Sequence, residues 1–222
     1  VPMSSIRTIK PAMGGGFGGK AEATSLDFCS VLLARKTGRP VLMEYSRKEM
    51  SLHGRGRHAQ IIRLKTGVRK DGTLLAVHAD IILDGGAYTS YGIITAYYSG
   101  VLLTTPYKLP NFRFEGRRAY TNLPACGAMR GNGTPQPRFA FESQLDLIAQ
   151  DLGLDPMEIR KLNALEPNTM TVNDLKITSC EFRQCLDLVE AESHWKEKKG
   201  HLPFGKGIGM ACGTFISGAG HP

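Results

Sequence analysis

The chain has 222 residues, of which 41% are hydrophobic and 22% charged, the balance of a soluble globular protein. Its formal charge is +8, but the basic residues are dispersed, so composition carries no nucleic-acid signature. No stretch approaches the roughly 20 apolar residues of a membrane span, and the first residues lack an apolar signal-peptide core. Because the chain has no initiator Met, we expect an excised or processed piece.

The cysteines and histidines restrict the kinds of metal site that this chain can hold. The five cysteines are odd in number and include no Cys-x-x-Cys pair, which argues against a disulfide framework, a zinc ribbon or an iron–sulfur cluster. The six histidines show no metal-ligand spacing. We therefore expect buried thiols in a reducing, cytoplasmic compartment and no metal held by protein ligands.

The N-terminal quarter predicts one strand, one glycine-rich loop, one helix and a second strand. Residues 5–12 favour a short strand that ends at a proline. The apolar spacing over 21–37 predicts a largely buried helix that stops at Gly38. Residues 41–45, Val-Leu-Met-Glu-Tyr, are typical of a second strand.

The next stretch predicts a hairpin followed by a long loop. Residues 61–68 and 75–83 alternate in polarity as half-buried strands do, and a Lys-Asp-Gly-Thr turn at 70–73 joins them. Residues 84–106 are rich in Gly, Tyr, Thr and Ser and predict a long structured loop with room for a short helix, which is a common place for function. A further strand is expected over 112–120.

The remainder predicts helices and then a change of character. An amphipathic helix covers 141–152, and Asp155 followed by proline begins another. Ser179 is the expected cap of a third helix over 180–194, and 205–213 has the pattern of a strand. Because strands and helices are mixed without strict alternation, the sequence predicts the α+β class.

The first motif with chemical meaning is a glycine-rich loop between a strand and a helix. Glycines let the backbone take positive φ and bring N–H groups against a ligand, and a helix start favours anions. The loop does not end in the Gly-Lys-Ser/Thr of a phosphate-binding loop. It also does not match the glycine pattern of a dinucleotide-binding site. A tight turn that packs a helix on a strand is the competing interpretation. The loop reads Gly14-Gly15-Gly16-Phe17-Gly18-Gly19-Lys20.

The second motif, Ala128-Met-Arg-Gly-Asn-Gly-Thr-Pro-Gln136, is again a flexible loop ahead of a helix. Its Arg130 can bind an oxyanion or phosphate through two parallel hydrogen bonds. An ordinary arginine in a Gly/Pro loop is the competing interpretation.

Together the motifs are far more specific than either one alone. The two loops, with Pro106-Tyr-Lys-Leu-Pro-Asn111 and Thr121-Asn-Leu-Pro124 between them, resemble in order and spacing the molybdenum-binding subunit of the xanthine dehydrogenase/aldehyde oxidase family. The resemblance covers nearly the whole chain. It implies a molybdopterin cofactor, expected in its cytosine dinucleotide form, whose dithiolene holds the molybdenum without a protein ligand.

The resemblance also implies which residues lie beside the cofactor. Family members place the Phe and backbone of the first loop and the Arg of the second loop there. These expected cofactor contacts are Gly15, Gly16, Phe17, Gly18, Gly19, Arg130 and Gly131.

The chain departs from the family's purine-oxidising members at three substrate positions. The Glu that follows the glycine-loop Lys is Ala21 here, with Glu22 next to it, and a substrate-stacking Phe is replaced by Asn132. The segment that should supply an Arg carries Tyr97 and Tyr98 instead. Purine oxidation is therefore not expected. Carbon monoxide chemistry is not expected either, because that branch has Cys where Gly131 stands.

Two reactions remain for an enzyme of this family. Within the family the second loop and residues 207–213 look most like 4-hydroxybenzoyl-CoA reductase, in which Tyr97 or Tyr98 would donate a proton during ring reduction. Each tyrosine can equally be a packing residue. The alternative is oxidative hydroxylation of an aromatic N-heterocycle or an aldehyde. A different class altogether is a non-enzymatic basic domain that binds nucleotides or RNA.

The resemblance implies a larger assembly and a domain boundary within the chain. Residues 1–200 would be a first cofactor-binding domain, and 201–222 would begin a second. The expected partners are the rest of the large subunit, an iron–sulfur subunit, an FAD subunit and a small aromatic substrate, with neither nucleic acid nor membrane. The family's catalytic Glu lies beyond the residues present here, so the chain alone is expected to be inactive and empty of cofactor.

Overall fold

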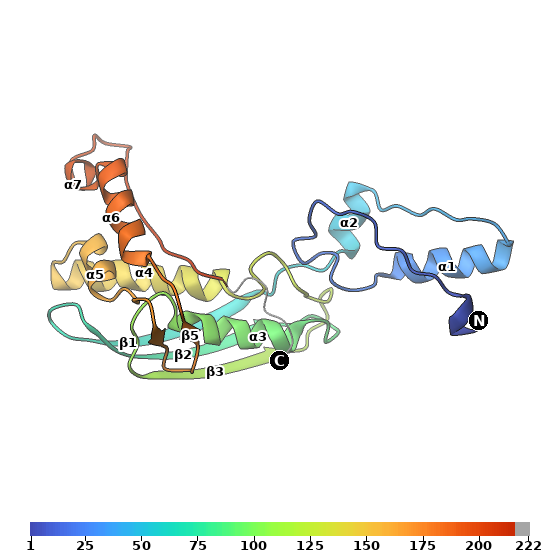
Figure 1. The fold of residues 1–222 in the computed structure, drawn as a ribbon, viewed down its shortest axis with the longest axis horizontal. Helices are drawn as coiled ribbons and strands as arrows, with labels where there is room; N and C mark the ends of the chain where they lie inside the picture. Colours follow the sequence, from blue (N-terminus) through green and yellow to red (C-terminus); the bar gives the residue numbers. More distant parts are fainter. Residues whose placement is uncertain (216–222) are drawn as a thin grey trace.

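The computed structural model describes residues 1–215 and shows an elongated molecule with two parts (Figure 1). One part, here called the N-terminal lobe, is residues 1–54; it holds the 3-10 turn η1 (Met3–Ser5) and the helices α1 (Ser25–Thr37) and α2 (Arg47–His53). The other part, the body, contains the sheet and the remaining helices. The mixture of helix and sheet confirms the α+β class.

The body is built on a three-stranded sheet of β1 (Gln60–Val68), β2 (Leu74–Asp84) and β3 (Phe112–Ala119), with β2 in the middle. Strands β1 and β2 form the predicted antiparallel hairpin. Strand β3 runs parallel to β2, and a crossover through α3 (Gly92–Val101) and the 3-10 turn η2 (Leu102–Thr104) connects the two. This crossover lies within residues 84–106, where the sequence predicts a long loop.

One face of the sheet is packed against helices. Alternate residues of β2, among them Ala79, Ile81 and Leu83, are fully buried against Phe141 and Leu145. Phe141 and Leu145 lie four residues apart on α4 (Pro135–Leu152), so they face the sheet together. Burial of each such large apolar side chain stabilises the fold by about 1.5–3 kcal/mol. The opposite face is polar and carries the ion pairs of Asp80 with Arg63 and Arg117.

The C-terminal third is helical and packs on the end of α4. Helix α5 (Pro156–Leu162) begins at Asp155, whose carboxylate accepts a hydrogen bond from Met157 N at 2.6 Å, which confirms the predicted cap. A short hairpin of β4 (Thr169–Met170) and β5 (Lys176–Ile177), which the sequence does not predict, precedes α6 (Phe182–Ser193) and α7 (Trp195–Lys198). None of the helices within residues 1–215 is both long and apolar enough to cross a lipid bilayer.

Several expectations about the N-terminal lobe are wrong. Residues 5–12 and 41–45 form no strand, because no other strand in the described residues pairs with them. The helix predicted over 21–37 begins only at Ser25, where Thr24 and the following Asp27 form a capping box. The helix is also not buried: none of its residues is, and Phe28 is 64% exposed.

Other corrections concern element ends and the last segment. The helix expected at 141 starts at Pro135, since proline suits the first helical position. Ser179 does not cap α6, whose N-cap is Glu181. The strand expected over 205–213 is wrong, because Gly205 lies in a turn and residues 206–213 belong to no strand. The expected thiol burial is also wrong in part, because Cys29 and Cys185 are exposed.

Candidate functional site

The first glycine-rich loop is an exposed turn on the N-terminal lobe. Its centre is Phe17, which has a positive φ of 48°, and the turn is closed by a 2.9 Å hydrogen bond from Gly19 N to Gly16 O. The Phe17 ring is 67% exposed. A non-glycine residue in the left-handed region is uncommon and marks a turn that surrounding contacts must maintain.

Those contacts come from the second loop, more than a hundred residues further along the chain. The amide of Arg130 donates a hydrogen bond to the carbonyl oxygen of Phe17 at 2.8 Å, and its guanidinium carbon lies 5.6 Å from the centroid of the Phe17 ring. Gly18, with a φ of +93°, leaves no room for a side chain, because a Cβ there would lie 2.6 Å from the carbonyl carbon of Ala128. The structure thus brings the two sequence motifs together.

A cationic cleft of about 770 Å³ opens beside the second loop. Arg57, Arg130 and Arg138 line it, together with Thr134 at the start of α4 and residues 213–215. Arg57 also donates to the carbonyl oxygen of Arg130 at 2.7 Å, so the loop and the cleft wall are linked directly. Three guanidinium groups and the positive end of a helix favour an anionic ligand.

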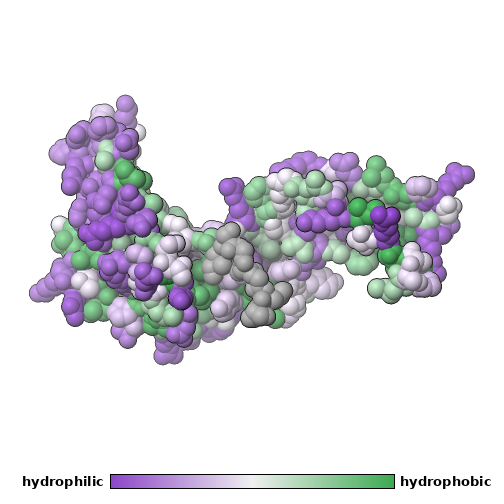
Figure 2. Space-filling view, in the orientation of Figure 1, coloured by the Kyte–Doolittle hydropathy of each residue, from purple (hydrophilic) through white to green (hydrophobic). Residues whose placement is uncertain are grey.

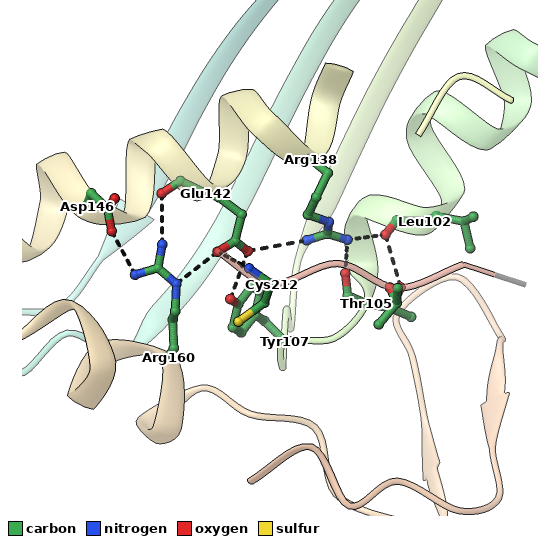
Figure 3. A network of polar contacts seen from close by, with 9 residues as sticks. Leu102, Thr105, Tyr107, Arg138, Glu142, Asp146, Arg160 and Cys212 are labelled. Atoms are coloured by element: carbon green, nitrogen blue, oxygen red, sulfur yellow. Dashed lines mark hydrogen bonds and ion pairs between the residues drawn. The ribbon is translucent and has the colours of Figure 1, made fainter. Parts of the chain in front are cut away.

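A buried polar network holds the walls of this cleft in place (Figure 3). Glu142 of α4 lies at its centre and accepts hydrogen bonds from Tyr107 Oη at 2.8 Å, Arg160 Nε at 2.8 Å and Cys212 N at 3.0 Å. The Arg138 guanidinium donates to the carbonyl oxygens of residues 102 and 105 and approaches Glu142 at 3.9 Å. The network therefore joins α4, the α3–η2 crossover and the segment leading to 213–215.

Burial shapes the electrostatics of this network. Burial lowers the pKa of Arg138, although the nearby Glu142 carboxylate opposes that shift. Burial likewise disfavours the charge of Arg160, but the ion pair with Glu142 outweighs it and raises the pKa. Burial also raises the pKa values of Tyr107 and Cys212, so both are protonated at neutral pH. The hydrogen bonds of Glu142 with Tyr107, Arg160 and Cys212 tie the elements around the cleft together, so we assign the network a structural role.

The residues expected to contact a substrate lie around the same two loops. Ala21 follows the glycine loop and is exposed. Asn132 has a φ of 41°, and its side-chain oxygen accepts a 2.8 Å hydrogen bond from Thr95 of α3. Glu22 accepts a hydrogen bond from Ser90 and pairs with Arg55.

The two tyrosines of α3 have different surroundings. Tyr98 lines a small depression with Thr134 and Arg138, and its ring lies 6.2 Å from that of Phe215 in the cleft wall. Tyr97 is 57% exposed and, by helical spacing, lies on the opposite side of α3 from Thr95. Of the two, Tyr98 is therefore the one beside the cleft.

Four members of the site are not predicted from the sequence: Arg55, Arg57, Ser90 and Arg138. The run Gly54-Arg-Gly-Arg-His58 is the one signal that could have indicated two of them, since glycines alternate with basic residues there. Within residues 1–215 no cluster of three or more His, Cys, Asp or Glu side chains could hold a metal ion. The two glycine-rich loops and the arginines of the cleft are suited to binding an anionic ligand.

Fold and site together are those of a cofactor-binding domain in which two glycine-rich loops meet beside a cationic cleft. Residues 1–164 match the model of the molybdopterin cofactor-binding domain. The chain is 42% identical over 164 residues to the nicotinate dehydrogenase large molybdopterin subunit of Eubacterium barkeri, covering 74% of this chain and 38% of that protein. It is 35% identical over 223 residues to the xanthine dehydrogenase molybdenum-binding subunit of Escherichia coli O157:H7, covering 98% of this chain and 30% of that protein.

Among solved structures, quinoline 2-oxidoreductase from Pseudomonas putida 86 is similar, with a TM-score of 0.74 and 29% identity, covering 84% of this chain and 24% of that one. The chain belongs to the molybdopterin cofactor-binding domain family of the xanthine dehydrogenase/aldehyde oxidoreductase type. It spans 30–38% of the length of these two curated relatives.

Proposed function

We propose that this protein is the part of a molybdenum-dependent oxidoreductase in which two loops hold the molybdopterin cofactor. The observation that carries the proposal is the junction of Phe17 with Arg130. A backbone hydrogen bond and a cation–π contact join two glycine-rich loops from distant parts of the chain, beside a cationic cleft. We propose the same role for the neighbouring residues Gly15, Gly16, Gly18, Gly19 and Gly131.

The residues present fit such a cofactor. Molybdopterin carries phosphate, which suits the guanidinium groups of Arg57, Arg130 and Arg138 in the cleft. Its own dithiolene sulfurs hold the molybdenum, so the site needs exposed backbone and cations rather than a protein ligand set. The exposed turn around Phe17 leaves backbone free for close approach. The dinucleotide form with cytosine remains part of this proposal.

We propose an aromatic N-heterocycle as the substrate, hydroxylated oxidatively. The two positions that would carry charge toward a purine are uncharged here, Ala21 and Tyr98, and uncharged Asn132 stands in place of the stacking Phe. An uncharged wall suits a flat apolar ring, because a buried charge without a partner is costly. The nicotinate dehydrogenase and quinoline oxidoreductase relatives, whose names refer to N-heterocycles, support this choice.

When bound, the cofactor would supply two-electron redox chemistry, with iron–sulfur and flavin groups on other domains or subunits as the proposed electron partners. The contributions of this chain are binding and orientation. Arg130 would hold an oxyanion of the cofactor near Phe17, and the Phe17 ring would shield that side of the cofactor from water. Asn132, fixed by Thr95, borders the substrate space. The general base of the reaction is expected outside these residues.

Reductive dehydroxylation of 4-hydroxybenzoyl-CoA is the second candidate, and the position of Tyr98 favours it. A phenol beside the cleft can donate a proton to a reduced ring, and the cations nearby would attract the phosphates of a CoA thioester. Tyr97 lies away from the cleft and is the weaker candidate for this role. The non-enzymatic RNA-binding alternative has no support, since the chain belongs to an enzyme cofactor domain family.

A substrate panel on the complete complex separates these candidates. We expect turnover of quinoline- or pyridine-type heterocycles with an artificial electron acceptor, and no reduction of 4-hydroxybenzoyl-CoA. The reverse result, with Tyr98→Phe slowing the reduction while Tyr97→Phe does not, would establish the second candidate. A complex that contains no molybdenum would contradict both.

We also propose that residues 1–200 form a first cofactor-binding domain and that residues 201–222 begin a second. The segment near Cys212 is bound to the body through Glu142, and Thr214 hydrogen-bonds Thr105 at 2.7 Å. Residues 216–222 lie outside the described residues. Limited proteolysis of the complete subunit tests the boundary, with cleavage expected near residues 200–205 and cleavage confined to other sites as the contrary result.

A further inference from the structure

The N-terminal lobe has little packing of its own to hold the glycine loop in place. Neither α1 nor α2 contains a buried residue, and the apolar side chains of Phe28 and Val31 are exposed. Figure 2 shows hydrophobic residues on the surface of the lobe. Among residues 1–215, the contacts that hold the loop against the body are therefore those at the junction between the two parts.

One such contact centres on Glu22, two residues after the glycine loop. Its carboxylate accepts a 2.6 Å hydrogen bond from the Ser90 hydroxyl and forms an ion pair with Arg55. The Glu22 side chain is 22% exposed and the Arg55 side chain 35% exposed. A partly buried charge with two such partners is worth more than a surface ion pair, because solvent screens it less.

The body shows two features that accommodate this contact. Ser90 has a φ of 45°, a left-handed conformation that a serine rarely adopts. Gly127 makes room for the partners, since a Cβ there would lie 2.8 Å from Arg55 Cδ and 3.0 Å from Ser90 Oγ. Gly127 directly precedes Ala128, against which Gly18 packs. The Glu22 contact and the loop junction are therefore adjacent.

The Ser90 partner is itself fixed to the sheet. Arg118 of β3 donates to the carbonyl oxygens of Gly85 at 2.7 Å and Tyr88 at 2.8 Å. Thr89 Oγ1 and Tyr120 Oη are 2.6 Å apart. A contact with Ser90 is thus a contact with a fixed point of the body rather than with a free loop.

We propose that Glu22 is a positioning residue that, with Arg55 and Ser90, holds the glycine loop against residues 128–130 in the arrangement that the cofactor requires. This inference rests on the proposed function. It also gives a role to the carboxylate next to Ala21. Because Glu22 is bound to Arg55 and Ser90, its charge is not available to the proposed substrate wall. No other residue of the glycine loop or its flanks makes an ion pair across the junction among the described residues.

The test uses the complete complex with Glu22→Gln and Ser90→Gly. Ser90→Gly removes the hydroxyl while suiting the left-handed backbone, so it isolates the contact from strain. We expect both variants to raise hydrogen exchange in peptides covering residues 14–24 and to lower kcat about tenfold with little change in KM, at an unchanged melting temperature. Exchanging the charges, Glu22→Arg with Arg55→Glu, should recover part of the loss.

Glu166→Gln is the matched control, because it also breaks an ion pair, with Lys108 at 2.7 Å, far from the junction. Wild-type exchange and turnover in both test variants would overturn the proposal, as would an equal rise in exchange at residues 14–24 and an equal loss of turnover in the Glu166→Gln control. If the wild-type complex contains no molybdenum, the proposed function fails while the exchange measurement still decides the role of Glu22.

Discussion

Gly18→Ala tests the junction of the two loops most sharply, because the structure defines its cost. At a φ of +93° an alanine is strained by about 1–2 kcal/mol. Its Cβ would lie 2.6 Å from the carbonyl carbon of Ala128 and 2.9 Å from Met129 N, and closer still to the carbonyl oxygen. Backbone atoms cannot rotate away, so the loops must separate, at about 1–3 kcal/mol more.

The expected result is loss of molybdenum from the complex. If cofactor binding bears the whole cost, about 2–5 kcal/mol weakens it roughly 30- to 4,000-fold, and the loss is measured as molybdenum per subunit by mass spectrometry. The matched control is Gly38→Ala at the end of α1. Gly38 has a φ of +65° but no neighbour within 4 Å of its Cβ, so it carries the backbone cost without the overlap.

Equal molybdenum content in the two variants would refute this reasoning. It would mean that the loops can part by several tenths of an ångström without consequence for the cofactor. Loss of molybdenum in both variants would mean that backbone strain anywhere in the lobe releases the cofactor. The contact between Gly18 and Ala128 would then have no specific role.

Three further predictions use other features of the site. Arg130→Ala should reduce turnover far more than it lowers the melting temperature, because a charged hydrogen bond to an oxyanion is worth about 1.5–3 kcal/mol; equal losses with cofactor retained would make Arg130 a structural residue. Burial and the nearby Arg118 hold the pKa of His58 below its ordinary value, so the unfolded chain takes up a proton that the native one refuses. Stability should therefore fall as pH drops below about 6.5, and His58→Gln should flatten that dependence in thermal melts across pH 5–8. The complex should not oxidise xanthine. Turnover of xanthine at the rate of its best heterocycle would contradict the role given to Ala21, Tyr98 and Asn132.

The β1–β2 hairpin and helix α5 of the body follow from local sequence, because the residues that define each element lie within the element or next to it. The hairpin of β1 and β2 has alternating polarity around a Gly72 turn, and α5 has its Asp155 cap. The structure of the N-terminal lobe could not be predicted in the same way. The apolar spacing of α1 predicts a buried helix, but no described residue covers it. Hydrophobic periodicity reports that a face is apolar and cannot say which chain covers it.

The candidate site was predictable only in part for a similar reason. Glycine density and Arg130 mark the two loops in sequence, but their hydrogen bond depends on the tertiary fold. Arg57 and Arg138 resemble ordinary surface or helix residues until the fold places them in one cleft. The partnership of Glu22 with Ser90 depends on a left-handed serine that no local pattern indicates.

The most direct test of the account is an experimental density map of the complete, metal-loaded complex. We expect molybdopterin density beside the Phe17 ring and the Arg130 guanidinium, with the phosphate toward the cleft that Arg57 and Arg138 line. Cofactor density bound elsewhere, with the Phe17–Arg130 junction free of ligand, would contradict the central claim.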